Sequence, residues 1–113
     1  MNTFLITLDW DIPFETRSKY VAYNHLFKFL RDNKIKYFYE RHSSRNNTHI
    51  KFNMHNITLL DSFCIRALLK DDKNRLLIDL MRYYKNMEIN RLWDCKFKNG
   101  KELRAGNWVR VYV

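Results

Sequence analysis

The sequence predicts an α+β domain in which helices cover one face of an antiparallel sheet. Apolar residues recur at every second position over residues 4–12 and 50–54, which is the period of a strand with one buried face. Over residues 21–30 and 76–84 they recur instead at helical spacing. With 113 residues, 46% of them hydrophobic, the chain is long enough for one modest core, so we expect a single domain spanning residues 1–113.

The first strand is expected to end at Pro13, which breaks the alternating pattern. Five apolar residues share one face of this strand: Phe4, Ile6, Leu8, Trp10 and Ile12. The intervening Asp9 and Asp11 therefore leave the other face, about 6–7 Å apart along the strand. Two carboxylates this close repel each other unless a divalent cation, a basic side chain or water lies between them.

A helix is expected within residues 15–33, where apolar residues follow helical spacing and Asp32 and Asn33 form a plausible stop. The next segment, Ile35 to about His42, is rich in tyrosine and phenylalanine, which favours a second strand. After the turn SSRNN, the segment THIKFNMH alternates again and predicts a third strand. We expect the second and third strands to form a hairpin.

Two further helices are expected in the second half of the chain. Thr58 and Asp61 form a capping-box-like start for a helix that continues to Leu69. The next helix has Asp71 or Asp72 as its cap and an apolar face made of Leu76, Leu77, Leu80, Met81 and Tyr84. The tail is strand-like, with Asn99-Gly100 as a hairpin turn. This order of elements predicts a ferredoxin-like, or split-βαβ, arrangement with helices on one face.

In such a fold the other face of the sheet stays open and collects the polar residues of each strand. The expected set is Asp9, Asp11, His49, Lys51, Asn53, Trp108, Arg110 and Tyr112. The carboxylates thus share a surface with a histidine and with basic and aromatic side chains. We interpret this surface as a functional site.

The net charge of +9 and the isoelectric point near 9.7 indicate a polyanionic partner. Aromatic residues make up 16% of the chain, which favours single-stranded DNA or RNA, because bases stack on aromatic rings while lysine and arginine contact the phosphates. The expected contact residues are Lys36, Lys51, Trp108, Arg110 and Tyr112. The competing interpretation is a basic protein without such a partner.

The sequence also bears on location. No apolar run approaches the roughly 20 residues that span a bilayer, and the first residues lack the basic start of a signal peptide. Cys64 and Cys95 lie far apart in apolar surroundings, as expected of reduced core cysteines. We therefore expect a cytoplasmic protein with no membrane partner.

Several sequence motifs of this chain resemble those of the catalytic palm of archaeo-eukaryotic primases and primase-polymerases. That superfamily has a strand motif hhhDhD, which LITLDWD matches with Asp9 and Asp11. It has a serine six residues before a histidine that enters a strand, as Ser43 and His49 do in SSRNNTHIKF. A later acid follows apolar residues, and Asp79 in RLLID or Asp94 in NRLWD offers it. The short chain is similar in size to palm-like proteins of archaeal viruses and plasmids, and this resemblance implies the cytoplasm of a mobile element's host as its location.

The resemblance implies particular roles for these residues. Asp9, Asp11 and the third acid would bind Mg²⁺ or Mn²⁺, the hard cations that stabilise phosphoryl transfer. His49 would contact a nucleoside triphosphate, with Lys51 beside it, and Ser43 and Arg45 would shape the phosphate-facing turn. As the third acid, Asp94 lies in a strand-like run, whereas Asp79 is helical and spaced for surface ion pairs with Arg75 and Arg82.

The chain departs from the primase pattern in three respects: the turn SSRNNTH lacks glycine, 113 residues leave no room for the extra α/β module of full primases, and the third acid is ambiguous. Two functions of different classes therefore stay open. The first is a minimal palm with metal-dependent nucleotidyl transfer. The second is a non-catalytic single-strand-binding module of RRM-like form. A weaker third is an accessory protein that binds other replication proteins. The two aspartates favour the first, because a pure binder gains nothing from acids on a phosphate-binding surface.

Overall fold

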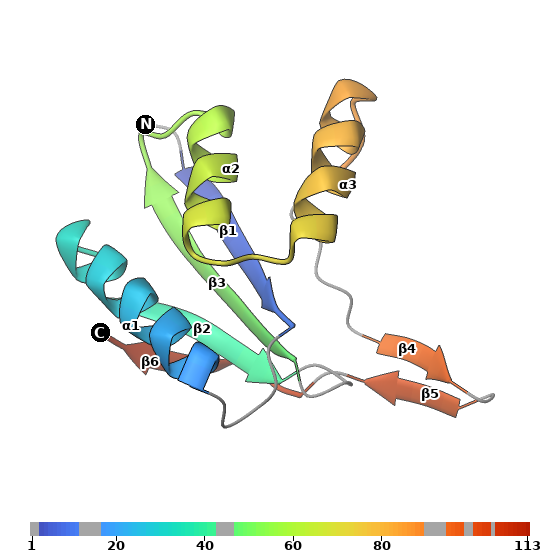
Figure 1. Cartoon of the computed structure of the whole chain (residues 1–113), viewed down its shortest axis with the longest axis horizontal. Coiled ribbons are helices and arrows are strands. Elements are labelled where there is room, and N and C mark those ends of the chain that lie inside the picture. The colour runs from blue at the N-terminus through green and yellow to red at the C-terminus, as the bar shows by residue number, and fades with distance from the viewer. Residues whose placement is uncertain (1–2, 12–16, 43–46, 90–94, 99–100, 105) are drawn as a thin grey trace.

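The computed structural model describes residues 3–11, 17–42, 47–89, 95–98, 101–104 and 106–113. The elements follow the order strand, helix, strand, strand, helix, helix, and end in short strands (Figure 1). They are β1 (Thr3–Trp10), α1 (Arg17–Asp32), β2 (Tyr37–His42), β3 (Thr48–His55), α2 (Leu59–Leu68), α3 (Lys73–Tyr84), β4 (Cys95–Lys98), β5 (Lys101–Arg104) and β6 (Val109–Tyr112).

Four strands form an antiparallel sheet in the order β1-β3-β2-β6, and β4 pairs with β5 in a separate two-stranded sheet (Figure 1). The predicted α+β class and the hairpin of the second and third strands are confirmed. The ferredoxin-like order is not confirmed. In that arrangement a final strand lies beside β1, whereas β6 pairs with β2 at the opposite edge.

The core lies between the sheet and the helices α1 and α2. On the sheet side, Ile6, Leu8, Ile50, Phe52 and Met54 are buried, which confirms the predicted register, and Phe4 is half-buried. The helices contribute the buried residues Ala22, Leu26 and Leu30 of α1 and Leu69 at the end of α2. The alternate residues of each strand therefore face the open side of the sheet.

Trp10 is the largest fully buried side chain and joins three elements. Its ring packs edge-on against Tyr23 of α1, with centroids 4.9 Å apart. Its Nε1 donates a hydrogen bond of 2.9 Å to the carbonyl of Leu69, at the end of α2. The buried indole thus keeps its polar group bonded while it holds α1 and α2 on the same face of β1.

The outer edge of β1 is covered by the connection between α2 and α3. The amide of Asp9 donates to Asp71 Oδ1 at 2.8 Å, and the amide of Asp72 donates to the carbonyl of Asp9 at 3.2 Å. Arg75 Nη1 donates to the carbonyl of Thr7 at 3.0 Å. Because these groups bond the backbone that a neighbouring strand would use, β1 is protected from pairing at this edge.

Helix α3 has its polar face turned inward. Arg66 of α2 is fully buried, with Nε 2.7 Å from Asp71 Oδ2 and Nη1 2.7 Å from Asp79 Oδ2. Asp79 is itself only 3% exposed, so the interpretation of Asp79 as a surface residue is wrong. Helical spacing places Asp79 next to Arg75 and Arg82 on the same helix, but it does not show that Arg66 of another helix approaches Asp79.

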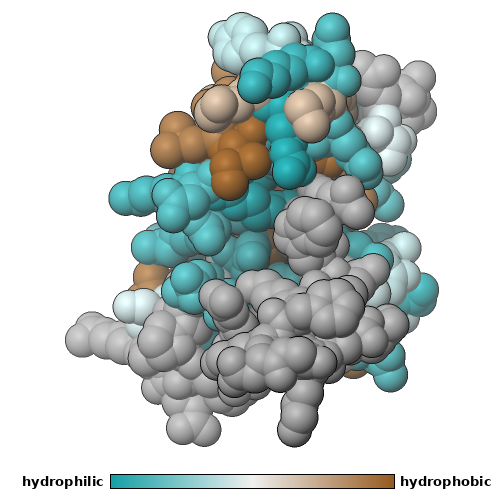
Figure 2. Space-filling model, turned by 90° about the vertical axis from the view of Figure 1, so that its right-hand side faces the viewer, coloured by the Kyte–Doolittle hydropathy of each residue, from teal (hydrophilic) through white to brown (hydrophobic). Residues whose placement is uncertain are grey.

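The apolar residues of α3 share one face as predicted, but this face is exposed. Four residues of the predicted face, Leu77, Leu80, Met81 and Tyr84, are 37–82% exposed. Figure 2 shows a hydrophobic patch on the side of the molecule that carries α3, bordered by hydrophilic surface. The buried ions on the opposite face decide this orientation, because Arg66 requires a counter-charge that the apolar face does not offer.

Two expectations about the environment of the chain can be compared with the structure. Cys64 is exposed, so its prediction as a core cysteine is wrong. Within the described ranges, no helix has the length and hydrophobicity needed to cross a membrane.

Candidate functional site

The open face of the four-stranded sheet brings the predicted polar residues together. The register aligns Thr7, Lys51, Tyr39 and Arg110 in one row across β1, β3, β2 and β6. The next row aligns Asp9, His49 and Arg41. Because side chains alternate along each strand, all of these residues share one face. Cations, aromatic rings and a carboxylate thus lie side by side, although they come from four separate segments of the chain.

Cations lie over the aromatic rings of this face. Trp108, which directly precedes β6, has Lys51 Nζ 4.1 Å and Arg41 Cζ 4.3 Å from its ring centroid. Arg110 Cζ lies 4.7 Å from the centroid of Tyr37, and its Nη2 donates to the Tyr39 hydroxyl at 2.8 Å. Such contacts hold flexible cations close to flat apolar surfaces. Hydrogen bonds to the hydroxyls of Tyr112 and Tyr39 raise the pKa of Arg110, so it stays charged.

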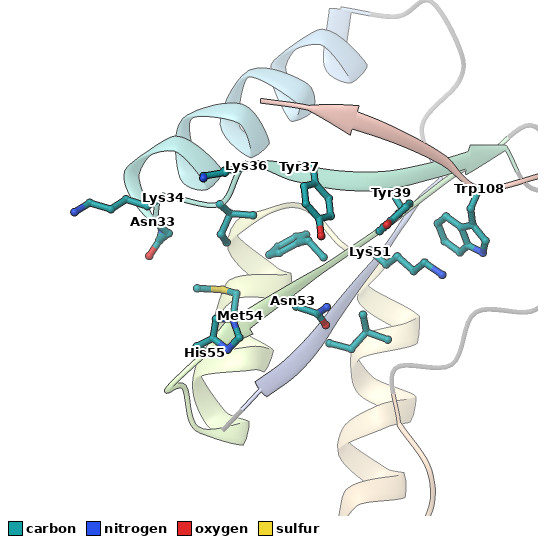
Figure 3. Close-up of a pocket in the computed structure, with 13 residues that line it drawn as sticks. Asn33, Lys34, Lys36, Tyr37, Tyr39, Lys51, Asn53, Met54, His55 and Trp108 are labelled. Atoms are coloured by element: carbon teal, nitrogen blue, oxygen red, sulfur yellow. The ribbon is translucent and has the colours of Figure 1, made fainter. Parts of the chain in front are cut away.

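A cleft of about 800 Å³ opens on this face, and we call it the open-face cleft (Figure 3). The pairing between β2 and β3 ends at Tyr39 and Lys51, whereas β3 continues beside β1 to His55. The start of β2 and the end of β3 therefore separate, and the cleft lies between them. Its lining includes Ile35, Lys36, Tyr37, Tyr39, Lys51, Phe52, Asn53, Met54 and Trp108.

Lys34 lines the same cleft in an uncommon backbone conformation, with φ of 57°. It follows the end of α1, where the amide of Ile35 bonds the carbonyl of Leu30 and the amide of Lys34 bonds that of Arg31. This is a Schellman motif, whose left-handed position favours glycine because glycine has no Cβ. Lys34 occupies this position in spite of that steric cost.

Asp9, His49 and Arg41 form a connected row at one end of the open face. Arg41 Nε donates to His49 Nδ1 at 3.0 Å, and His49 Nε2 lies 3.7 Å from Asp9 Oδ1. Because a guanidinium can only donate, His49 Nδ1 accepts, which leaves the ring proton on Nε2, facing Asp9. His49 is only 4% exposed, so its ring is largely covered. The side chains of this row are therefore held by contacts with one another and are less exposed than polar residues on an open surface.

Asp9 is the residue of this row with a strongly changed ionisation. Burial raises the pKa of Asp9 from 3.8 to about 6; Arg75 opposes the rise, and Asp71, Asp72 and Asp11 add to it. Its Oδ1 is buried and has no hydrogen-bond partner among the described residues. Around neutral pH the carboxylate is charged at the expense of stability.

Replacing Asp9 with Asn is therefore expected to raise the free energy of unfolding by about 1–2 kcal/mol at pH 8, after allowance for the exposed quarter of the side chain. Because the pKa of Asp9 is raised in the folded state, ionisation of its carboxyl group lowers the stability of the folded protein. This cost is fully present above about pH 6. The gain should shrink between pH 6 and pH 4 and vanish below about pH 4. Urea unfolding of both proteins at several pH values measures it. A gain that is independent of pH would contradict this account.

The remaining predicted catalytic and metal-binding residues are not brought together in the described part of the chain. Asp11 is exposed just beyond the end of β1, and Asp79 is bonded to Arg66 in the buried cluster. Ser43, Arg45 and Asp94 lie outside the described residues. Among the residues that are described, no group of three or more His, Cys, Asp or Glu side chains could hold a metal ion. The predicted Mg²⁺ or Mn²⁺ site, with a bound nucleotide, stays a prediction.

The predicted nucleic-acid contacts all lie on the open face or line its cleft. Lys36, Lys51 and Trp108 line the cleft, and Arg110 and Tyr112 lie on the outermost strand. Sequence reasoning missed Tyr37, Tyr39 and Arg41. Their alternate spacing in YFYERH was a usable signal, because it places all three on the face opposite to the buried Phe38.

The chain matches no protein-family model, no curated protein and no solved structure. The chemistry of the open face is therefore the basis for any functional assignment.

Proposed function

We propose that this protein binds single-stranded nucleic acid on the open face of its sheet. The observation that carries the proposal is the row in which Lys51, Tyr39 and Arg110 alternate across three strands, with Trp108 beside Lys51. Aromatic rings stack on the flat faces of bases, and cations between them contact the phosphates that link those bases. Bases of a duplex are already stacked on each other, so this surface fits unpaired strands better.

The charge distribution supports the same assignment. The chain carries a net charge of +9, and Lys51 and Arg110 lie over aromatic rings, with no carboxylate paired to either of them among the described residues. A surface for an acidic protein would not require a row of rings, whereas a surface for a neutral ligand would not require the cations. Single-stranded DNA or RNA requires both.

The affinity for a fluorescently labelled 20-nucleotide strand is expected to fall steeply with salt. Lys34, Lys36, Lys51 and Arg110 offer about four phosphate contacts, so log K against log salt concentration should have a slope of roughly −2 to −3. Fluorescence anisotropy with DNA, RNA and duplex DNA measures it. Duplex should bind at least tenfold more weakly.

Two variants with the same loss of charge provide the control. Lys51→Ala should reduce the magnitude of the slope by about 0.7, the contribution of one phosphate on a single strand. Lys28→Ala removes a lysine on α1 that pairs with Asp32 at 2.9 Å, and it should leave the slope unchanged. A flat salt dependence, or binding that prefers duplex, would refute the proposed function.

A second candidate function is metal-dependent nucleotide binding, as the resemblance to the primase palm implies. The observation in its favour is the buried Asp9 Oδ1, which lacks a hydrogen-bond partner among the described residues and lies 3.7 Å from His49 Nε2. The described residues do not complete a metal site by themselves, so this candidate depends on Asp94. Within it, the protein would belong with small replication proteins of mobile elements and keep a palm of ferredoxin-like ancestry.

The double variant Asp9→Asn/Asp11→Asn separates the two candidates. It should abolish Mn²⁺-dependent binding of a nucleoside triphosphate if the carboxylates hold metal. It should leave single-strand binding intact or strengthen it, because two negative charges are removed near the phosphates. Calorimetric titration with ATP, with and without Mn²⁺, measures the first effect. The absence of metal-dependent binding in the parent protein would exclude the second candidate.

A further inference from the structure

We propose that the open-face cleft takes one unstacked base of the bound strand, with Asn53 along the edge of that base and Lys34 and Lys36 at its phosphate. This inference rests on the proposed function and deepens it. It assigns the cleft a preference among bases. Stacking on the row of Lys51, Tyr39 and Arg110 alone would bind all four bases in a similar way.

The cleft has the shape and lining of a small-molecule site. Its volume of about 800 Å³ lies within the range of pockets that enclose most of a small ligand. Because β2 and β3 separate there, the apolar residues Ile35, Phe52 and Met54 form part of its lining. Tyr37, at the start of β2, offers a ring to a base that enters (Figure 3). An apolar lining with an aromatic wall favours a flat heterocycle over a hydrated ion.

Asn53 supplies the polar group that can read such a base. It is exposed and lines the cleft (Figure 3). Nothing in the described part of the chain forms a hydrogen bond with its carboxamide. By contrast, the carboxamide of Asn33 in the same lining donates to the carbonyl of Phe29 at 2.8 Å. A carboxamide offers one acceptor beside two donors, which matches N6 and N7 of adenine. We therefore expect adenine to be preferred.

The lysines at the other side of the cleft suit the phosphate. Lys34 and Lys36 are both exposed and flank Ile35 in the lining. Lys34 keeps its positive φ of 57° at a position that favours glycine. Lys70 adopts the same conformation after α2 but does not line the cleft, so it is the place of Lys34 in the lining that suits it to the phosphate. With lysines on one side and Asn53 across the cleft, the site fits a nucleoside monophosphate.

The test is a titration of the isotope-labelled protein with AMP, CMP, GMP, UMP and inorganic phosphate, followed by NMR. AMP should shift the side-chain amide signals of Asn53 and the backbone signals of residues 33–37 and 51–55. Inorganic phosphate should shift the signals of residues 34–36 without those of the Asn53 side chain. Asn53→Ala should weaken AMP binding by about fivefold or more and remove its advantage over CMP.

Two lysines in the same backbone motif provide a matched control. Lys70, with φ of 66°, follows α2 in the same way that Lys34 follows α1, and it does not line the cleft. Glycine adopts this conformation without strain, so Lys34→Gly and Lys70→Gly should both fold. Only Lys34→Gly should weaken AMP binding, by about threefold or more. Equal losses of AMP affinity in the two variants would show that binding depends only on the net charge of the protein. That result would overturn the proposed contact between Lys34 and the phosphate.

The outcomes separate this inference from the proposed function. If oligonucleotides bind while AMP leaves the Asn53 side chain unshifted, the cleft is not a base pocket and single-strand binding stands. If the four monophosphates bind equally and Asn53→Ala changes none of them, the assignment of Asn53 is wrong. If neither oligonucleotides nor monophosphates bind at low salt, both proposals fail.

Discussion

Replacing Asp71 with Ala is expected to lower the free energy of unfolding by about 3–5 kcal/mol, the usual cost of removing one partner from a buried ion pair. The carboxylate of Asp71 has four partners. Its Oδ2 lies 2.7 Å from Arg66 Nε and 2.8 Å from Arg75 Nη1. Its Oδ1 accepts from the amides of Asp9 at 2.8 Å and Asp72 at 2.9 Å. Asp71 therefore joins α2 and α3 to the edge of β1.

The cost is large because the groups left behind cannot reach water. Arg66 is fully buried and would keep Asp79 as its remaining acid neighbour in the cluster. The amide of Asp9 would lose its acceptor at the covered edge of β1. A domain of this size has a total stability of about 5–15 kcal/mol, so the variant should be close to unfolding. Asp71→Asn, which keeps an acceptor oxygen but no charge, should give an intermediate loss.

Urea unfolding followed by circular dichroism measures these losses, with Asp32→Ala as the control. Asp32 pairs with Lys28 at 2.9 Å, but both side chains are more than 60% exposed, so its removal should cost less than about 0.5 kcal/mol. Hydrogen exchange gives a local readout, because the amide of Asp9 should exchange faster in Asp71→Asn. A loss below 1 kcal/mol in Asp71→Ala would show that the buried cluster is not a major source of stability.

The second large effect is expected on binding, from the double variant Trp108→Ala/Tyr112→Ala. Each base stacked on an aromatic ring contributes about 1–3 kcal/mol, so each substitution should weaken single-strand binding about tenfold and both together about a hundredfold. The two residues are about 13 Å apart along the last strand, at about 3.3 Å per residue. Their effects should therefore add.

Trp108 should matter beyond its own ring, because it holds Lys51 and Arg41 at 4.1 and 4.3 Å. Trp108→Phe keeps a ring there and should recover most of the lost affinity. Tyr84→Ala is the matched control for Tyr112→Ala: both tyrosines are well exposed, at 82% and 68%, but Tyr84 lies on α3. Fluorescence anisotropy at fixed salt measures all variants. Equal losses from Tyr84→Ala and Tyr112→Ala would place the interface elsewhere.

The amino-acid sequence by itself determined the local structure and the sides of the sheet. Alternation in β1 and β3 predicted that Ile6 and Ile50 would be buried and that His49 and Lys51 would face the open side, because the period of a strand leaves no other choice once one face is buried. The capping box of Thr58 and Asp61 was predicted because its hydrogen bonds join residues three apart. Such features need no information from distant segments.

The tertiary structure decided which elements meet and which face of a helix turns inward. The pattern of α3 showed an apolar face, but Arg66, from another helix, drew Asp79 and the polar face inward. The connection after α2 covers the edge of β1, and β6 pairs with β2. These outcomes depend on long-range partners, whose identity no local period contains.

For the candidate site too, the sequence determined some features and the tertiary structure decided others. Its residue types and their side of the sheet followed from the sequence, including Lys51, Arg110 and Tyr112. The open-face cleft did not, because it arises where the pairing of β2 with β3 stops while β3 continues beside β1. Nor did the raised pKa of Asp9, because its burial depends on the packing of the whole chain around β1. Periodicity assigns a side chain to a face, whereas burial, ion pairing and the shape of a cleft are set by what packs against that face.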